Sequence, residues 1–254
     1  MAVRSNDHCE HCDLDVQGSG LPEGCRLLAR SGNDCRSAVT FLATAEERFA
    51  DQHLSAYVTG EWHRGQALLY AIQLLGDVCG PLGVPALRAF LADPQGKHQD
   101  LFSVAIIALD KRDGTAATPV FQRLLADRRS GVKEYALCAL AFSGDDRAWE
   151  DVLGLLTVWL RPSQKNKGPV MECITYLARQ LNGPADARLQ DVADLMRKRA
   201  GSLTQSQLDW CNKTWPTLLQ DGPVGLPNIT AMEVDARRWA FVDHPSLARQ
   251  EGGP

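Results

Sequence analysis

The feature that most constrains this fold is a ten-residue string that occurs twice. The first copy, from Val84 to Asp93, reads V-P-A-L-R-A-F-L-A-D, and the second, from Thr118 to Asp127, reads T-P-V-F-Q-R-L-L-A-D. The proline, the apolar residues and the closing Ala-Asp coincide at an offset of 34 residues. Self-similarity at a fixed period of this size is typical of repeat proteins, in which one supersecondary unit recurs along the chain.

The segments before these strings repeat as well, with apolar residues at i, i+1 and i+4. That spacing, like i, i+3 and i+4 in the strings, marks one face of an α-helix. Further offsets of 31 and 37 residues carry both patterns through four units. The first-helix rows are Ala71, Ile72, Leu75; Ala105, Ile106, Leu109; Ala136, Leu137, Leu140; and Cys173, Ile174, Leu177. The second-helix rows are Leu87, Phe90, Leu91; Phe121, Leu124, Leu125; Val152, Leu155, Leu156; and Leu189, Val192, Ala193.

Each unit is therefore predicted to be a pair of helices. One pair cannot bury its apolar stripe alone, so stacked neighbours must complete the core. A further helix is expected after the last pair, because Ser202 to Gln205 and Thr204 to Gln207 both fit a capping box. Before the array, Ser37 to Gln52 has a helical pattern and is predicted to form a degenerate capping repeat. The four units run over about 64–93, 98–127, 129–160 and 166–200.

The paired pattern resembles the short bacterial HEAT-like (armadillo-type) repeats over residues 64–200. The resemblance lies in the row Ala71, Ala105, Ala136 and Cys173 and in the proline-led strings, although the third and fourth units lack that proline. It implies an all-α fold, an α-α superhelix (solenoid) of about four to five helix pairs, and little about activity. The expected organisation is an irregular, cysteine-containing segment 1–34, a helical repeat domain 35–220 and a C-terminal tail 221–254.

Charge and hydropathy narrow the classes of function. The chain has 27 Lys and Arg against 31 Asp and Glu, a formal net charge of −4, which argues against a dedicated nucleic-acid binder. No segment reaches the roughly 18 apolar residues that span a bilayer. The first residues also lack the apolar core of a signal peptide. We therefore expect a cytoplasmic protein with no membrane segment.

Eight cysteines fall into two groups. Cys79, Cys138, Cys173 and Cys211 lie in or beside apolar helical patterns and are predicted to be small buried residues. The others crowd the N-terminus, where a C-x-x-C pair can present two thiolates to one Zn²⁺, which takes four ligands. A structural zinc site is one hypothesis; a tail with incidental cysteines and a redox or disulfide role are the others. The candidate metal ligands are Cys9, Cys12, Cys25 and Cys35, with His8 and His11 as alternates.

The leading functional hypothesis is a non-enzymatic scaffold that binds a protein or peptide. No nucleophile elbow, P-loop or H-E-x-x-H motif is present, so no catalytic residue is assigned. In HEAT-like arrays the second helices line the concave side, and the residues beside their apolar rows face out. Those residues are Arg88, Gln122, Leu153 and Gln190 in one row and Ala89, Arg123, Gly154 and Asp191 in the next, with Trp149 at the edge.

The alternative is a nucleic-acid-acting enzyme, because bacterial glycosylases that remove alkylated bases also have a HEAT-like fold. Those enzymes use aromatic and acidic residues in a groove with a basic rim. Trp149, Glu150, Asp151 and Trp159 would supply the first set, and Arg128, Arg129, Lys133, Lys165 and Lys167 the second. The run Arg197-Lys198-Arg199 ends a predicted helix, where positive charge is favourable near the helix dipole.

The cysteine cluster makes a prediction that does not depend on the rest of the fold. If the four N-terminal cysteines hold a metal, the purified chain carries about one zinc per molecule, since one tetrahedral site uses all four thiolates. Changing Cys9 and Cys12 to Ser removes that zinc, as measured by elemental analysis. Metal-free protein with an intact helical circular dichroism spectrum would contradict the zinc site.

Overall fold

The computed structural model describes residues 8–9, 14–15, 47–60, 66–77, 80–92, 101–164 and 168–232. Their regular structure is helical apart from one antiparallel pair of two-residue strands, β1 (His8–Cys9) and β2 (Leu14–Asp15). The chain divides into two compact units, Met1–Gly114 (unit 1) and Thr115–Pro254 (unit 2). Within the described ranges, no helix is long and apolar enough to cross a membrane.

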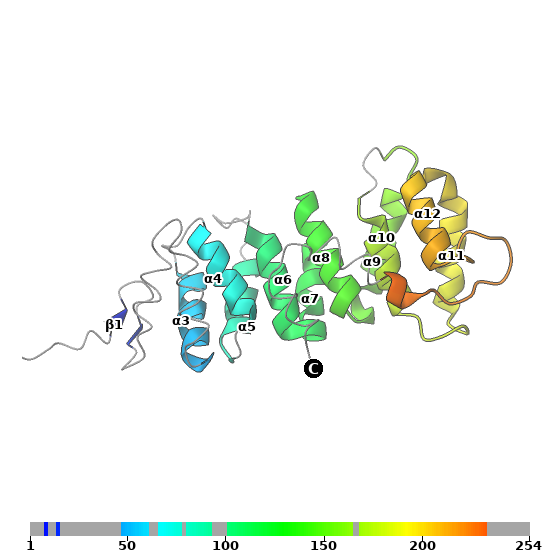
Figure 1. Ribbon diagram of the computed structural model, residues 1–254. Coiled ribbons are helices and arrows are strands. Elements are labelled where there is room, and N and C mark those ends of the chain that lie inside the picture. The colour runs from blue at the N-terminus through cyan, green and yellow to red at the C-terminus, as the bar shows by residue number, and fades with distance from the viewer. Residues whose placement is uncertain are drawn as a thin grey trace, which may run out of the picture. The chain divides into compact units, whose positions relative to one another are not determined.

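The described residues of unit 1 form four helices, blue to green in Figure 1. The helix α3 packs against both α4 and α5, and α6 also packs against α4 and α5. Within the described residues α3 runs to Thr59, seven residues past the predicted end at Gln52. The bounds are α3 Glu47–Thr59, α4 Gln66–Asp77, α5 Gly83–Ala92 and α6 Phe102–Asp113.

Unit 2 contains the remaining helices, green to orange in Figure 1. The helix α8 packs against α7 and α10, and α10 packs against α8, α9 and α12. The α-helices are α7 Thr118–Leu124, α8 Ser130–Ser143, α9 Trp149–Trp159, α10 Val170–Arg179, α11 Ala187–Arg199 and α12 Gln205–Thr214. The 3-10 turns are η2 Gly114–Ala117, which spans the unit boundary, η3 Asp146–Ala148 and η4 Ala200–Ser202.

The predicted inward rows are buried. All twelve first-helix positions, on α4, α6, α8 and α10, have 0% of their surface exposed. On the second helices α5, α7, α9 and α11, ten of the twelve predicted positions are buried, and Phe90 and Leu155 are half-buried. Phe90 instead lies against Phe102, with 5.7 Å between the ring centroids. The apolar periodicity therefore located both helices of each pair and the inward side of each helix.

A buried ion pair connects the four helices of unit 1. Asp51 of α3 is 1% exposed and accepts hydrogen bonds from the backbone N–H groups of Leu82 (2.8 Å) and Gly83 (2.9 Å) at the start of α5. Arg112 of α6 donates to Asp51 Oδ1 at 3.0 Å and to the carbonyl of Leu75 in α4 at 2.9 Å. A Cβ at Gly83 would lie 2.0 Å from the Arg112 guanidinium, so this close approach requires glycine.

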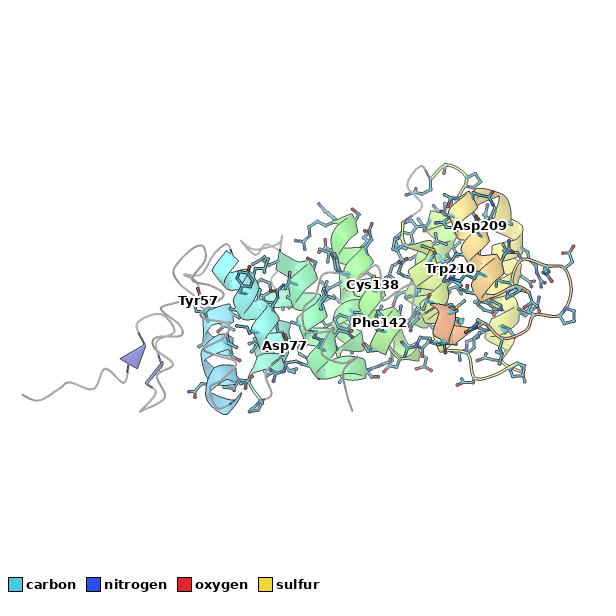
Figure 2. The ribbon with its side chains drawn as sticks, in the orientation of Figure 1. Tyr57, Asp77, Cys138, Phe142, Asp209 and Trp210 are labelled. Atoms are coloured by element: carbon cyan, nitrogen blue, oxygen red, sulfur yellow. The ribbon has the colours of Figure 1, made fainter. Side chains whose placement is uncertain are left out.

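A second tie between α4 and α6 lies nearer the surface. Lys111 donates to Asp77 Oδ1 at 2.8 Å, and Figure 2 labels Asp77 at the end of α4. This pair joins the last turn of α6 to the last turn of α4 beside the buried pair. Exposed pairs of this kind contribute little to stability, so the buried pair is the one that matters for the fold.

In unit 2 an Asp-x-Arg motif recurs at three turns between helices. In each copy the aspartate accepts a hydrogen bond from the arginine backbone N–H and from its guanidinium, which closes a tight local turn. Two of these aspartates, Asp145 and Asp186, are the N-caps of η3 and α11. The pairs are Asp127 with Arg129, Asp145 with Arg147, and Asp186 with Arg188.

The start of α12 and the segment after it close the end of unit 2. Of the two predicted capping boxes, the one from Thr204 to Gln207 forms. After α12, the indole Nε1 of the buried Trp215 donates to the carbonyl of Gly225 at 2.7 Å. Met232 is also fully buried. Residues 221–232, which we expected to belong to a tail, therefore pack against the end of this unit.

The buried ion pair of unit 1 should carry far more stability than an exposed pair in the same unit. Changing Arg112 to Met leaves the Asp51 carboxylate buried without its cation, which typically costs about 3–5 kcal/mol. Changing Arg88 to Met breaks the exposed ion pair between Arg88 and Asp113 and should cost about 1 kcal/mol or less. Urea unfolding followed by circular dichroism measures both losses, and equal losses would contradict the structural role of the buried pair.

Candidate partner-binding surface

The candidate surface in unit 2 consists of the outward positions on α7, α9 and α11. We call it the α9 face after its central helix. Two contacts hold the three helices together: Gln122 of α7 donates to Asp151 of α9 at 2.6 Å, and Arg188 of α11 lies over Trp149 of α9. None of the predicted outward positions is buried. They are Gln122, Arg123, Leu153, Gly154, Gln190 and Asp191, of which Gln122 and Leu153 are half-buried and the others exposed.

The middle of the α9 face is apolar and open. Gly154 is exposed, and a Cβ built on it would meet nothing within 4 Å. Val158, one helical turn further, is 37% exposed and is one of only three large hydrophobic side chains that the described residues leave exposed. Residues four apart on a helix share a face, so Gly154 and Val158 form one shallow strip with space above it.

Polar side chains occupy the outward positions of the two other helices. On α7, Arg123 is exposed beside the half-buried Gln122. On α11, Gln190 donates to Asp194 at 2.7 Å, and Asp191 is exposed beside it. The outward positions therefore carry a positive charge on α7 and carboxylates on α11, a combination that favours a partner of complementary charge.

Trp149 does not offer the exposed anchor that the sequence pattern led us to expect. The side chain is 6% exposed, and the Arg188 guanidinium lies 4.6 Å from its ring centroid in a cation–π contact. Arg188 also binds Asp186, and this hydrogen-bonded guanidinium lowers the pKa of the Asp186 carboxyl. Because Trp149 is buried and the Arg188 guanidinium lies over its ring, Trp149 connects α9 to α11 and is not on the exposed part of the α9 face.

Arg88, the first residue of the predicted outward row, belongs to unit 1. It is exposed, and its Nε donates to Asp113 Oδ2 at 3.0 Å. Ala89, next to it, is exposed as well. The outward direction predicted for this part of α5 is therefore observed, and the α9 face is defined by the residues of unit 2 alone.

The predicted metal ligands lie almost entirely outside the described residues. Cys9 is in strand β1, whereas Cys12, Cys25 and Cys35 fall in undescribed ranges. Among the described residues, no group of three or more His, Cys, Asp or Glu could hold a metal ion. Cys138, Cys173 and Cys211 are free and buried, as expected. Burial raises the pKa of the Cys173 thiol well above its usual value, which makes this thiol unreactive.

A small pocket of about 190 Å³ gathers several residues of the alternative hypothesis. Trp159, Arg128 and Lys133 line it together, as an aromatic residue with a basic rim would. Trp149, Glu150 and Asp151 are at the opposite end of α9, about 15 Å away along the helix axis. Arg129 instead binds Asp127, and Lys165 and Lys167 lie outside the described residues.

The same pocket holds residues that the sequence analysis did not single out. Glu134 lines it, and burial raises the pKa of its carboxyl. Gly168 has a φ of +54°, and a Cβ there would lie 2.5 Å from Trp159, so the indole packs directly on the backbone. A glycine with positive φ next to a tryptophan partner leaves no periodic signal in the sequence. The other residues that complete the lining are Ser130 and Gln164.

A comparison of this chain with known protein families, with characterised proteins and with solved structures finds no match. A function is therefore proposed from the chain's own residues.

Proposed function

We propose that this chain is a non-enzymatic, HEAT-like repeat protein that binds a protein or peptide partner on the α9 face. The observation that carries the proposal is the open strip of Gly154 and Val158 on α9. Small residues permit close approach of a partner backbone, and an exposed apolar residue gains free energy when it is covered. The fitting partner segment has an apolar side chain that covers the strip.

The helix-pair rows support the proposal that the chain forms a HEAT-like superhelix. Four pairs repeat the same buried positions, and Ala or Cys recurs beside the large residues of each first helix. Repeats of this kind use the outward side of their second helices for binding. A reducing, cytoplasmic location is consistent with the three free, buried cysteines.

The second candidate is a nucleic-acid-acting protein that resembles the bacterial alkylated-base glycosylases. The pocket of Trp159, Arg128 and Lys133 favours it, because an aromatic ring can stack on a base while cations bind the phosphates. Glu134 lines the same pocket, and burial raises the pKa of its carboxyl, so Glu134 is the candidate general acid or base of this second function. The net charge of −4 weighs against this candidate, since nucleic-acid binding depends on a basic excess.

The α9 face predicts a loss of partner binding when the strip is filled. A double variant, Gly154→Arg with Val158→Asp, should reduce partner recovery at least tenfold, because bulk and charge replace the open apolar strip. The space above Gly154 means that the fold tolerates the change. Affinity capture from the native cell, quantified by mass spectrometry against wild type, measures the loss.

The matched control places the same two side chains on exposed positions of α12, as Ser206→Arg with Asn212→Asp. This control should keep wild-type recovery, and all three proteins should melt at similar temperatures. Undiminished recovery by the α9 variant would contradict the proposed binding face. Binding of duplex DNA that is lost when Arg128 and Lys133 become Gln would instead move the function to the Trp159 pocket.

A further inference from the structure

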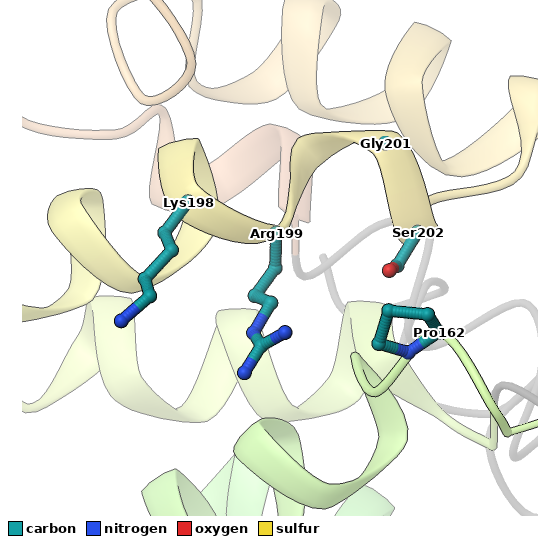
Figure 3. A pocket seen from close by; sticks show the side chains of 5 residues that line it. All are labelled: Pro162, Lys198, Arg199, Gly201 and Ser202. Atoms are coloured by element: carbon teal, nitrogen blue, oxygen red, sulfur yellow. The ribbon is translucent and has the colours of Figure 1, made fainter.

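A second pocket in unit 2 lies where the end of α11 meets the turn after α9. Its volume is about 430 Å³, and Figure 3 shows it from close by. The pocket is separate from the α9 face and from the Trp159 pocket, because it shares no lining residue with either. The residues that line it are Pro162, Lys198, Arg199, Gly201 and Ser202.

The lining of this pocket is cationic. Lys198 and Arg199 are consecutive residues at the end of α11, and their side chains extend to the same side in Figure 3. Ser202 adds a hydroxyl, whereas Pro162 and Gly201 add no charge. None of the five described lining residues is acidic, so two positive charges share this cavity without a carboxylate among the described residues of its wall.

Arg199, one of the residues that line the pocket, has a hydrogen-bond donor without an acceptor among the described residues. Its Nε is buried and has no hydrogen-bond acceptor within the described part of the chain. Buried donors in proteins are nearly always paired, because a donor removed from water without an acceptor destabilises the fold. The donor therefore points to an acceptor that the described residues do not provide.

The favourable interaction of positive charge with the C-terminal end of a helix dipole is a simpler explanation for basic residues at the end of α11. It accounts for Arg197. Arg197 Nη2 donates to the carbonyl of Gly222 at 2.9 Å and so ties α11 to the segment after α12. Arg197 Nε, like Arg199 Nε, is buried without an acceptor among the described residues, so the unpaired Nε alone does not distinguish the two side chains. Arg199 differs because it lines the pocket together with Lys198, and an effect of the helix dipole alone needs no cavity, since a solvated cation serves equally well.

We propose that this pocket binds the phosphate group of a small anionic ligand. The planar guanidinium of Arg199 matches two phosphate oxygens, and Lys198 supplies a second positive charge against the dianion. The Ser202 hydroxyl is the third donor. A volume of about 430 Å³ exceeds that of a single phosphate and leaves room for a small organic group over Pro162 and Gly201. The ligand class is inorganic phosphate or a small phosphate monoester.

The test follows the Arg199 Nε–H signal by nuclear magnetic resonance on the ¹⁵N-labelled full chain. Sodium phosphate at pH 7.5 should shift this signal saturably, whereas sodium chloride at the same ionic strength should not. The signal is assigned by its loss in the Arg199→Lys variant. Phenyl phosphate distinguishes the two sources: tighter binding than phosphate identifies a monoester, and equal binding identifies inorganic phosphate.

Two variants weaken binding by different routes. Lys198→Gln removes one charge from an exposed side chain, and Gly201→Asp adds a carboxylate at a position where a Cβ meets nothing within 4 Å. Each should weaken phosphate binding at least tenfold and leave the melting temperature unchanged. Lys213→Gln, an equal loss of charge at an exposed position of α12 outside the lining residues of the pocket, should keep wild-type affinity. No saturable shift with phosphate, or wild-type affinity in both pocket variants, would overturn the proposal.

Discussion

The constraint on which the fold of unit 2 depends is that its first helices, α8 and α10, are enclosed over much of their length. In α8, all six residues from Ala136 to Ala141 are buried, and in α10 all seven from Glu172 to Ala178 are buried. Six consecutive buried residues cover the whole circumference of a helix, so neighbours must surround it. The contacts agree, because α8 packs against α7 and α10, and α10 packs against α8, α9 and α12. Enclosed helices have no exposed face, and for this reason we propose the second helices as the partner-binding surface.

Polar interactions at the helix ends hold this apolar arrangement in place. In unit 1 the pair of Asp51 and Arg112 satisfies backbone groups at the start of α5 and the end of α4. In unit 2 the side chain of Arg179 binds the carbonyl of Ala141, and the hydroxyl of Tyr176 binds the carbonyl of Asp145. Helix ends leave unsatisfied N–H and C=O groups, and these side chains satisfy some of them across neighbouring helices.

Apolar periodicity predicted the buried rows because large apolar side chains at helical spacing mark the buried face of a helix. It could not predict the buried ion pair, since Asp51 and Arg112 are 61 residues apart and each looks like an ordinary surface charge. The exposed position predicted for Trp149 was wrong for a related reason. A tryptophan occurs both at exposed edges and in packed positions, and the contact with Arg188 that buries this one comes from a residue 39 positions away. The Asp-x-Arg turns did carry a sequence signal, because three copies recur before helices. The two pockets depend on the folded positions of turns, which no period encodes.

The measurement that tests the enclosure of the first helices most directly compares one buried alanine with one exposed glycine. Ala139 lies in α8 outside the predicted apolar row and is 2% exposed, whereas Gly154 of α9 is exposed. Changing Ala139 to Asp places an unpaired charge inside the packed helices and should cost more than about 3 kcal/mol. Changing Gly154 to Asp should cost less than about 1 kcal/mol. Urea unfolding of the two variants gives both values. The enclosure predicts a wide gap between them, and a similar, small loss in both would contradict it.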